Sequence, residues 1–231
     1  MRRSAIVLLL SLTAGIAGQQ AAGIASAVAE VPVPRNYGDA MRWYRDAARA
    51  GDPKAMFYLG LTLEQGLQEQ PRPAEAVAWY KRSAEAGFAL AQFKLGVLYQ
   101  TGTVVPQNLE QARTWYAKAA AQGMASATYN LAVLLEAGQG GPAEPSRAVE
   151  LYREAARNGV SEAFLNLGNL YASGQGVEAD AVQALAWLYL AGEAGVEGAD
   201  DLRRPVEAVL SQAERDQAVE RARRWKAENG R

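Results

Sequence analysis

The segments AQFKLGVLYQTG (residues 91–102) and ARTWYAKAAAQG (residues 112–123) are the two halves of a unit that returns every 36 residues. The second half recurs as AMRWYRDAARAG (40–51), AVAWYKRSAEAG (76–87) and AVELYREAARNG (148–159), and in altered form as ALAWLYLAGEAG (184–195). The first half recurs as AFLNLGNLYASG (163–174). A fixed period between about 20 and 50 residues is typical of a solenoid, in which each repeat packs on its neighbours. The repeat therefore favours a binding surface over a buried reaction centre.

Both halves of the unit have the spacing of an amphipathic helix. In the second half, apolar or small residues fall at 76, 79, 80, 83 and 84, which lie on one face of a helix. Each helix would have about 12–14 residues, too few to be stable alone in water, so its stability must come from its neighbours. We therefore predict an all-α protein, an α/α solenoid of helix-turn-helix repeats, with the Trp and Tyr side chains in its core.

The links between the helices carry capping residues. A glycine followed by an apolar residue, typical of a left-handed C-cap, ends the second-half helices at Gly87, Gly123, Gly159 and Gly195. Side chains suited to an N-cap are Asp52 (with Pro53 at the first helical position), Asn108, Ser161 and Asp180. The Gly-x-Gly loops at 138–140 and 174–176 follow no expected strand, so we interpret them as turns and not as phosphate sites.

The repeat occupies residues 38–198, as a lone first helix followed by four helix pairs. Residues 199–231 leave the period and are expected to form helices that cap the open end of the solenoid. The first would cover 200–210, with Pro205 in or near its first turn. The second would begin at a Ser211–Glu214 capping box and run to about Lys226. The residues expected to cover the end are Val206, Val209, Leu210, Val219 and Trp225.

Residues 1–29 have the features of a secretory signal peptide. Arg2 and Arg3 precede a mostly apolar segment (5–17), and the alanines at 27 and 29 fit a cleavage site before Glu30. A retained membrane anchor is the alternative, but the apolar run is broken and falls short of the roughly 20 residues of a span. Residues 30–37 would then be a short linker. We expect a periplasmic protein, or alternatively a secreted one, without stable membrane insertion after cleavage.

Histidine and cysteine are both absent from the sequence. Zinc sites built on imidazole, Ser–His–Asp triads and disulfides are therefore excluded. Without residues 1–29, 22 basic residues face 25 acidic ones, a net charge of −3. This balance provides no basic stripe for nucleic acid. We expect no cofactor, metal or catalytic residue, and we interpret the acidic residues at 200, 201, 214 and 216 as carboxylates at helix starts.

The repeat resembles the Sel-one-like repeat (SLR) family, a relative of the tetratricopeptide repeat. The resemblance rests on Ala-x-x-x-Leu-Gly-x-x-Tyr, on the loop GQGVEAD (174–180) and on Ala-x-x-Trp-Tyr-x-x-Ala-Ala-x-x-Gly, and it covers residues 40–195. The chain departs from this pattern where Ala132 replaces the glycine, and where Leu63 and Leu135 replace the tyrosine. The resemblance implies a right-handed superhelix of the tetratricopeptide type.

In the tetratricopeptide fold the Leu-Gly helix lines the concave side, so the resemblance implies a groove along these helices. The residues that the groove would present to a partner are Lys54, Phe57, Glu64, Phe93, Gln100, Ser126, Tyr129, Glu136, Glu162, Leu165 and Asn169. The residues at 57, 93, 129 and 165 share one repeat position, so packing on neighbouring helices is their alternative role. Such a groove would hold an extended segment or a helix of another protein.

SLR proteins are usually adaptors and scaffolds, including regulators in the cell envelope. The resemblance thus implies an exported, non-enzymatic scaffold whose partner is another protein or a peptide. Exchange of Glu64, Glu136 and Glu162 to lysine is expected to weaken binding without changing helicity. The alternative is an envelope enzyme acting on cell-wall or β-lactam material. That activity is associated with a cysteine-rich branch of the family, whose disulfide this chain lacks.

Overall fold

The computed structural model describes residues 37–66 and 70–230, and within these residues every regular element is an α-helix. The predicted α/α solenoid is therefore confirmed. The predicted signal peptide (1–29) and nearly all of the linker (30–37) lie outside the described residues, so both stay predictions. None of the described helices is both long and apolar enough to cross a membrane.

The helices follow one another along the chain and alternate in type. The second-half helices of the repeat, here called B helices, are α2 (Tyr37–Arg49), α4 (Pro73–Glu85), α6 (Leu109–Ala120), α8 (Pro145–Arg157) and α10 (Ala181–Glu193). The first-half helices, here called A helices, are α3 (Pro53–Gln65), α5 (Ala89–Thr101), α7 (Ala125–Glu136) and α9 (Glu162–Ser173). Two further helices, α11 (Ala199–Ala208) and α12 (Gln212–Asn229), follow the last pair.

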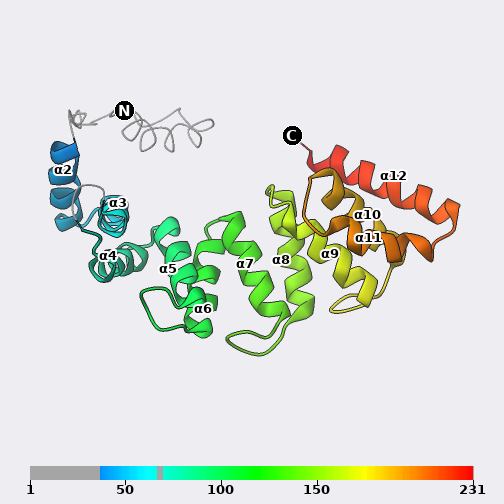
Figure 1. Cartoon of the computed structure of the whole chain (residues 1–231), viewed down its shortest axis with the longest axis horizontal. Coiled ribbons are helices and arrows are strands. Elements are labelled where there is room, and N and C mark those ends of the chain that lie inside the picture. Colours follow the sequence, from blue (N-terminus) through cyan, green and yellow to red (C-terminus); the bar gives the residue numbers. More distant parts are fainter. Residues whose placement is uncertain (1–36, 67–69, 231) are drawn as a thin grey trace.

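Each helix of the solenoid packs mainly on the helices before and after it in the sequence. The molecule is therefore an elongated row that runs from α2 at one end to α11 and α12 at the other (Figure 1). Short turns join each B helix to the next A helix, and longer loops join each A helix to its own B helix. This arrangement brings the A helices into one series, which is the property that a groove requires.

Alanine and glycine let the helices approach closely, and a tyrosine fills the space between them. Tyr80, Tyr116 and Tyr152, one in each of three successive B helices, are fully buried. A methyl group added at Gly96 of α5 would lie 2.5 Å from the Tyr116 ring, and one at Gly60 of α3 would lie 2.7 Å from the Tyr80 ring. The glycine of the Leu-Gly pair therefore provides the room that the tyrosine of the following helix occupies.

Most of the predicted capping residues act as expected. The side chains of Asp52, Asn108 and Asp180 each accept a backbone N–H three residues later, at 2.9 Å. The prediction for Ser161 was wrong, because its backbone is already helical (φ −67°, ψ −30°) and its hydroxyl makes no capping hydrogen bond. The 36-residue period explains the error: the residue equivalent to Asp52 is Val160, and Ser161 is equivalent to Pro53.

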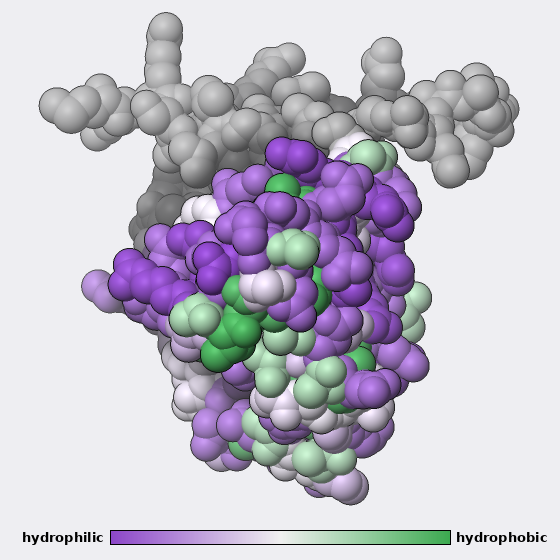
Figure 2. Space-filling view, turned by 90° about the vertical axis from the view of Figure 1, so that its right-hand side faces the viewer, coloured by the Kyte–Doolittle hydropathy of each residue, from purple (hydrophilic) through white to green (hydrophobic). Residues whose placement is uncertain are grey.

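The end of the solenoid is closed by α12, which packs on α10. Trp225 of α12 lies against Phe164 and Trp187, with ring centroids 4.9 and 5.7 Å away. Leu210 is buried, and Val206 packs against the same core. Small residues also contribute, because Ala218 and Ala222 are the buried residues of α12, whereas Val219 is half-buried. Seen from this end, the surface is mostly hydrophilic, with hydrophobic residues in small areas (Figure 2).

Three details of this C-terminal region differ from the prediction. Val209 is 77% exposed, because α11 ends at Ala208 and Val209 lies in the turn before α12. Pro205 lies inside α11, in its second turn, because the helix begins at Ala199. The last helix continues three residues beyond Lys226, to Asn229, and the expected Ser211–Glu214 capping box is present.

Candidate functional site

Polar side chains on the A helices hold the buried tyrosines in place. The hydroxyl of Tyr80 donates a hydrogen bond to Glu64 at 2.7 Å. In the next two pairs, Tyr116 donates to Gln100 at 2.6 Å and Tyr152 donates to Glu136 at 2.6 Å. We call these three pairs the tyrosine ladder. Each rung joins an A helix to its own B helix, with a constant separation of 16 residues.

The following repeat also contributes to the ladder. Lys94 of α5 donates a hydrogen bond to Glu64 at 2.9 Å, and Asn166 of α9 donates to the Tyr152 hydroxyl at 3.2 Å. Burial raises the pKa of Tyr116 to about 12. Burial and the hydrogen bond to Glu64 raise the pKa of Tyr80, and burial and Glu136 raise that of Tyr152. The three tyrosines therefore stay neutral hydrogen-bond donors at physiological pH.

The ladder stops in the fourth pair, where both partners are replaced together. Leu188 occupies the position of the tyrosine and is fully buried, and Ala172 occupies the position of its acceptor. A methyl group added at Gly168 would lie 2.6 Å from the Leu188 side chain, so the close packing of glycine against the B helix remains. Joint loss of donor and acceptor leaves no polar group without a partner, which makes the replacement tolerable.

The ladder gives several of the predicted groove residues a structural role. Glu64, Gln100 and Glu136 are half-buried acceptors of the tyrosine hydroxyls. The aromatic residues at 57, 93 and 129 pack on the same rings, with centroids 5.6–5.7 Å apart. Lysine in place of Glu64 or Glu136 would remove an acceptor from a buried hydroxyl. Such a change would therefore alter stability, and it would not report on binding alone.

The other predicted groove residues are more accessible. Lys54, Ser126, Glu162 and Asn169 are exposed on their A helices, and Leu165 is half-buried. Lys54, Ser126 and Glu162 share one repeat position with Leu90, which is 37% exposed and was not predicted as a groove residue. The period alone could have identified Leu90, because it lies 36 residues after Lys54.

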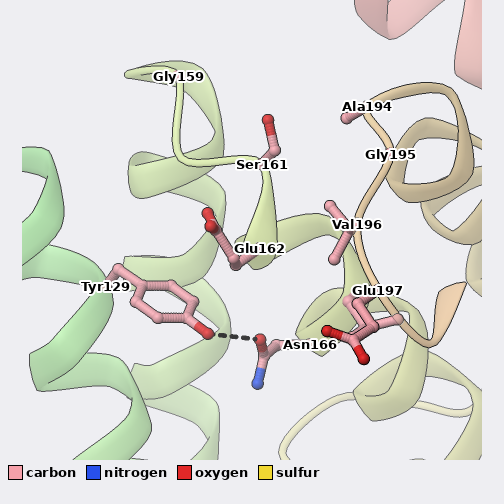
Figure 3. Close-up of a pocket in the computed structure, with 10 residues that line it drawn as sticks. Tyr129, Gly159, Ser161, Glu162, Asn166, Ala194, Gly195, Val196 and Glu197 are labelled. Atoms are coloured by element: carbon pink, nitrogen blue, oxygen red, sulfur yellow. Dashed lines mark hydrogen bonds between the residues drawn. The ribbon is translucent and has the colours of Figure 1, made fainter.

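The structure brings three of the predicted residues together in one pocket. Tyr129 of α7 and Glu162 and Leu165 of α9 line a pocket of about 610 Å³. The remaining lining residues come from the start of α9 and from the turns after α8 and α10: Gly159, Ser161, Asn166, Ala194, Gly195, Val196 and Glu197. The turn after α10 faces α9 across the pocket (Figure 3).

Hydrogen bonding fixes the side of the pocket formed by α7. The Tyr129 hydroxyl donates to the Asn166 carbonyl oxygen at 3.2 Å, which is drawn in Figure 3. Asn166 in turn donates to the ladder residue Tyr152, and Tyr152 to Glu136. Burial and the negative charges of Glu162 and Glu136 raise the pKa of Tyr129. A chain of hydrogen bonds therefore connects the pocket residue Tyr129 to the tyrosine ladder.

The electrostatic character of the pocket is negative. Glu162 and Glu197 line it, and both side chains are exposed. Among the described residues that form the lining, none is Lys or Arg. Gly159, Ala194 and Gly195 belong to the turns that end α8 and α10, and helix C-termini carry partial negative charge. Three lining residues were not predicted from the sequence: Asn166, Val196 and Glu197. Glu197 could not be found from the repeat, because it lies where the period decays and reaches the pocket only through the turn after α10.

Among the described residues, no group of three or more Asp or Glu side chains is placed to hold a metal ion. The pocket contains one serine, Ser161, and two carboxylates, without histidine, lysine or cysteine beside them. The two carboxylates accept hydrogen bonds and attract positive charge, and the Ser161 hydroxyl can donate or accept a hydrogen bond.

The comparisons with known proteins agree with the repeat. The family model of the Sel1 repeat matches residues 30–52, 53–88, 89–124, 125–160 and 161–196. The last four segments each contain one A helix and its B helix, and the first contains α2. No curated protein matches the chain.

Two solved structures are similar at about 30% identity. A Sel1 repeat protein from Oxalobacter formigenes is 31% identical, with a TM-score of 0.70 over 84% of this chain and 81% of the other. A protective antigen present in uropathogenic Escherichia coli strains, which displays an SLR fold, is 30% identical with a TM-score of 0.54. That match covers 85% of this chain and 50% of the antigen, so this chain spans half of its length.

Proposed function

Because the chain belongs to the Sel1 repeat family, whose members generally mediate protein–protein interaction, we propose that it is an exported scaffold that binds another protein or a peptide along its A helices. Scaffolds of this family are generally non-enzymatic, and we propose the same here. The role would be that of an adaptor in the bacterial envelope, and regulation would follow from whether its partner is bound.

The observation that carries this proposal is the pocket on the A helices. It lies beside exposed residues of the same face, and its lining combines apolar with hydrogen-bonding groups. Repeat proteins bind their partners along extended surfaces to which successive repeats contribute. A chain laid along the A helices would meet Lys54, Leu90, Ser126 and Glu162 in order.

Site-specific photo-crosslinking tests the binding face. A photoreactive amino acid would be placed at Ser126 or Asn169, which are exposed on A helices, and at Ala78 or Ala117, which are exposed on B helices. Crosslinking would be done in the native cells and read by mass spectrometry. We expect the same partner from both A-helix positions and not from the B-helix positions. Crosslinks of equal yield from all four positions would contradict a binding face on the A helices.

Export is tested separately, on the amino terminus of the protein. We propose that the signal peptide is removed after Ala29, in which case the purified protein begins at Glu30 and is found in the periplasmic fraction. N-terminal mass spectrometry after cell fractionation measures both properties. A protein that keeps residues 1–29 and stays with the cytosol would overturn the proposed location, and it would leave the protein-binding role to be judged by crosslinking.

A further inference from the structure

The exposed face of the A helices is not uniform in charge. At one repeat position the residues run from Lys54 through Leu90 and Ser126 to Glu162. Lys94, which donates a hydrogen bond to the ladder acceptor Glu64, also lies in the amino-terminal half of the described chain. The pocket lies at the opposite end, where Glu162 and Glu197 face it. A partner lying along this face would therefore pass from a lysine on α3 to two carboxylates at α9 and the turn after α10.

The pocket has room for a long side chain together with neighbouring parts of the segment that carries it. Its volume of about 610 Å³ is bounded by the Tyr129 ring and by the apolar side chains of Leu165 and Val196. The carboxylates of Glu162 and Glu197 come from different segments, α9 and the turn after α10 (Figure 3). Apolar groups beside carboxylates suit a side chain with an aliphatic stem and a charged end.

We propose that this pocket binds an arginine or lysine side chain of the partner protein. The inference rests on the proposed function, because it names the chemistry of the partner at the same site. The cationic end would accept no hydrogen bonds and would donate to Glu162 and Glu197. The stem would lie against Leu165 and Val196, and a guanidinium could also lie against the Tyr129 ring.

Other occupants fit the pocket less well. An anion would be favoured by the N-terminus of α9, but the first residue of that helix is Glu162, which supplies the negative charge itself. An apolar side chain would take water from two carboxylates without replacing their hydrogen bonds, which is unfavourable. Arg157, in the last turn of α8, lines a neighbouring pocket with Phe164 and Trp225 and is not among the residues that line this one.

A peptide-selection experiment tests the proposal with random peptides in place of the natural partner. A displayed library of random dodecapeptides would be selected on the purified protein, on the variant Glu162→Gln/Glu197→Gln and on the control variant Glu85→Gln/Glu220→Gln. The control residues are exposed carboxylates on α4 and α12, outside the pocket lining. The exchanges keep the shape of each side chain and remove only its charge.

We expect peptides selected on the wild type and on the control to be enriched in arginine or lysine at one position, with the enrichment lost on the pocket variant. For a selected peptide, the Kd should rise roughly tenfold or more for the pocket variant, and should also rise with salt. Replacing the selected basic residue by norleucine should have the same effect on the wild type and little effect on the variant.

Two results would overturn the proposal, and they differ in what they say about the proposed function. Peptides that bind the wild type without basic enrichment, or bind the pocket variant equally well, would refute a basic occupant and leave a peptide-binding scaffold. No selected peptide on any of the three folded proteins would count against both the basic occupant and peptide binding on this face.

Discussion

Val104 is the one non-glycine residue with positive φ among the described residues, at +69°. It lies in the loop between α5 and α6, and the residues one and two repeats later are Gly140 and Gly176, each with φ of +75°. A β-branched residue in this region is strained by about 1–3 kcal/mol. The loop keeps its repeat geometry at this position although the side chain does not suit it.

Exchange of Val104 to glycine is expected to stabilise the protein. Relief of the strain outweighs the added freedom of glycine in the unfolded chain, which leaves a gain of about 1 kcal/mol. The midpoint of urea unfolding, followed by circular dichroism, measures the change. Val105→Gly is the matched control and should destabilise, because Val105 packs against the core and has no positive φ. A lower midpoint for Val104→Gly would show that the loop gains more from the valine side chain than the strain costs.

The tyrosine ladder gives the protein a defined response to alkaline pH. The folded-state pKa of Tyr116 is about 12, whereas that of an unfolded tyrosine is 10.0. Above pH 10 the unfolded state loses this proton first, so the free energy of unfolding falls as pH rises from 10 to 12. Tyr80 and Tyr152 act in the same direction. The stabilisation is fully present below pH 10.

We expect Tyr116→Phe to lower stability at pH 7 by about 1 kcal/mol, because the Gln100 carbonyl loses its donor. We also expect the decline between pH 10 and 12 to be less steep in this variant. Chemical unfolding at a series of pH values measures both effects. Tyr99→Phe is the control, since Tyr99 is half-buried and outside the ladder. Equal slopes for the wild type and Tyr116→Phe would contradict a raised pKa at this residue.

The ladder also explains why some of the predicted groove residues have structural contacts. Periodicity places Glu64, Gln100 and Glu136 on an A-helix face, but it does not show which B-helix atom each one meets. A second pattern in the sequence does carry that information. Glu or Gln precedes Tyr by 16 residues in three repeats, and both are lost together at Ala172 and Leu188. Correlated replacement between repeats therefore indicates a contact that hydropathy alone cannot.

At the scale of elements, the packing of each A helix on its B helix depends on one pair of facing residues, a small one on the A helix and a large one on the B helix. Gly96 faces Tyr116, and Gly168 faces Leu188. In the third pair the glycine is replaced by Ala132, which is fully buried in the same cluster as Tyr152. The third interface has therefore adjusted to one additional methyl group, whereas the second has not.

Gly96→Ala is expected to destabilise the protein by up to about 2 kcal/mol. Alanine is the better helix former by about 1 kcal/mol, but its methyl group would lie 2.5 Å from the Tyr116 ring, and overpacking costs about 1–3 kcal/mol. The converse change, Ala132→Gly, should also destabilise, because it removes a buried methyl and a helix former. Thermal unfolding of both variants provides the measurement. A rise in Tm for Gly96→Ala would show that the ring moves aside freely.

The helices and most of their caps could be predicted because they depend on neighbours in the sequence. Apart from Ser161 and Leu90, which lie within the period, errors occurred where the chain leaves it. Val209 and Leu210 were both expected to cover the end of the solenoid, but the turn that joins α11 to α12 exposes Val209 and buries only Leu210. Likewise, Glu197 enters the pocket through a turn whose path depends on how α11 packs on α9 and α10. No local spacing rule specifies such a path.

At the scale of the whole molecule, contacts between chain neighbours make the repeats separable. Deleting residues 89–124 removes α5 and α6 and joins α4 to α7 at equivalent positions. We expect the shortened chain to fold with the same helicity per residue and a Tm lower by roughly 5–10 °C, because one interface between repeats is lost. Deleting residues 89–106 is the control. It would place two B helices in succession, and we expect it to abolish cooperative unfolding.

Circular dichroism and the cooperativity of thermal unfolding distinguish these outcomes. If the 36-residue deletion unfolds the chain while its expression is normal, stability depends on contacts beyond the nearest neighbours. In the amino-terminal half the structure argues against such a dependence on distant contacts, because α2 packs on α3, and α4 packs on α3 and α5.

The two ends of the row differ in a way that has a mechanical consequence. Among the described helices, α2 rests mainly on α3, whereas α10 is held by α9, α11 and α12 together. Under tension applied to its two ends, we expect α2 and α3 to separate and unfold first. The following helices would then unfold in order toward the carboxyl end, where α10 has three neighbours. The region with the pocket would then be the last to lose its shape, so a load on the amino-terminal half would leave a partner seated at α9 undisturbed.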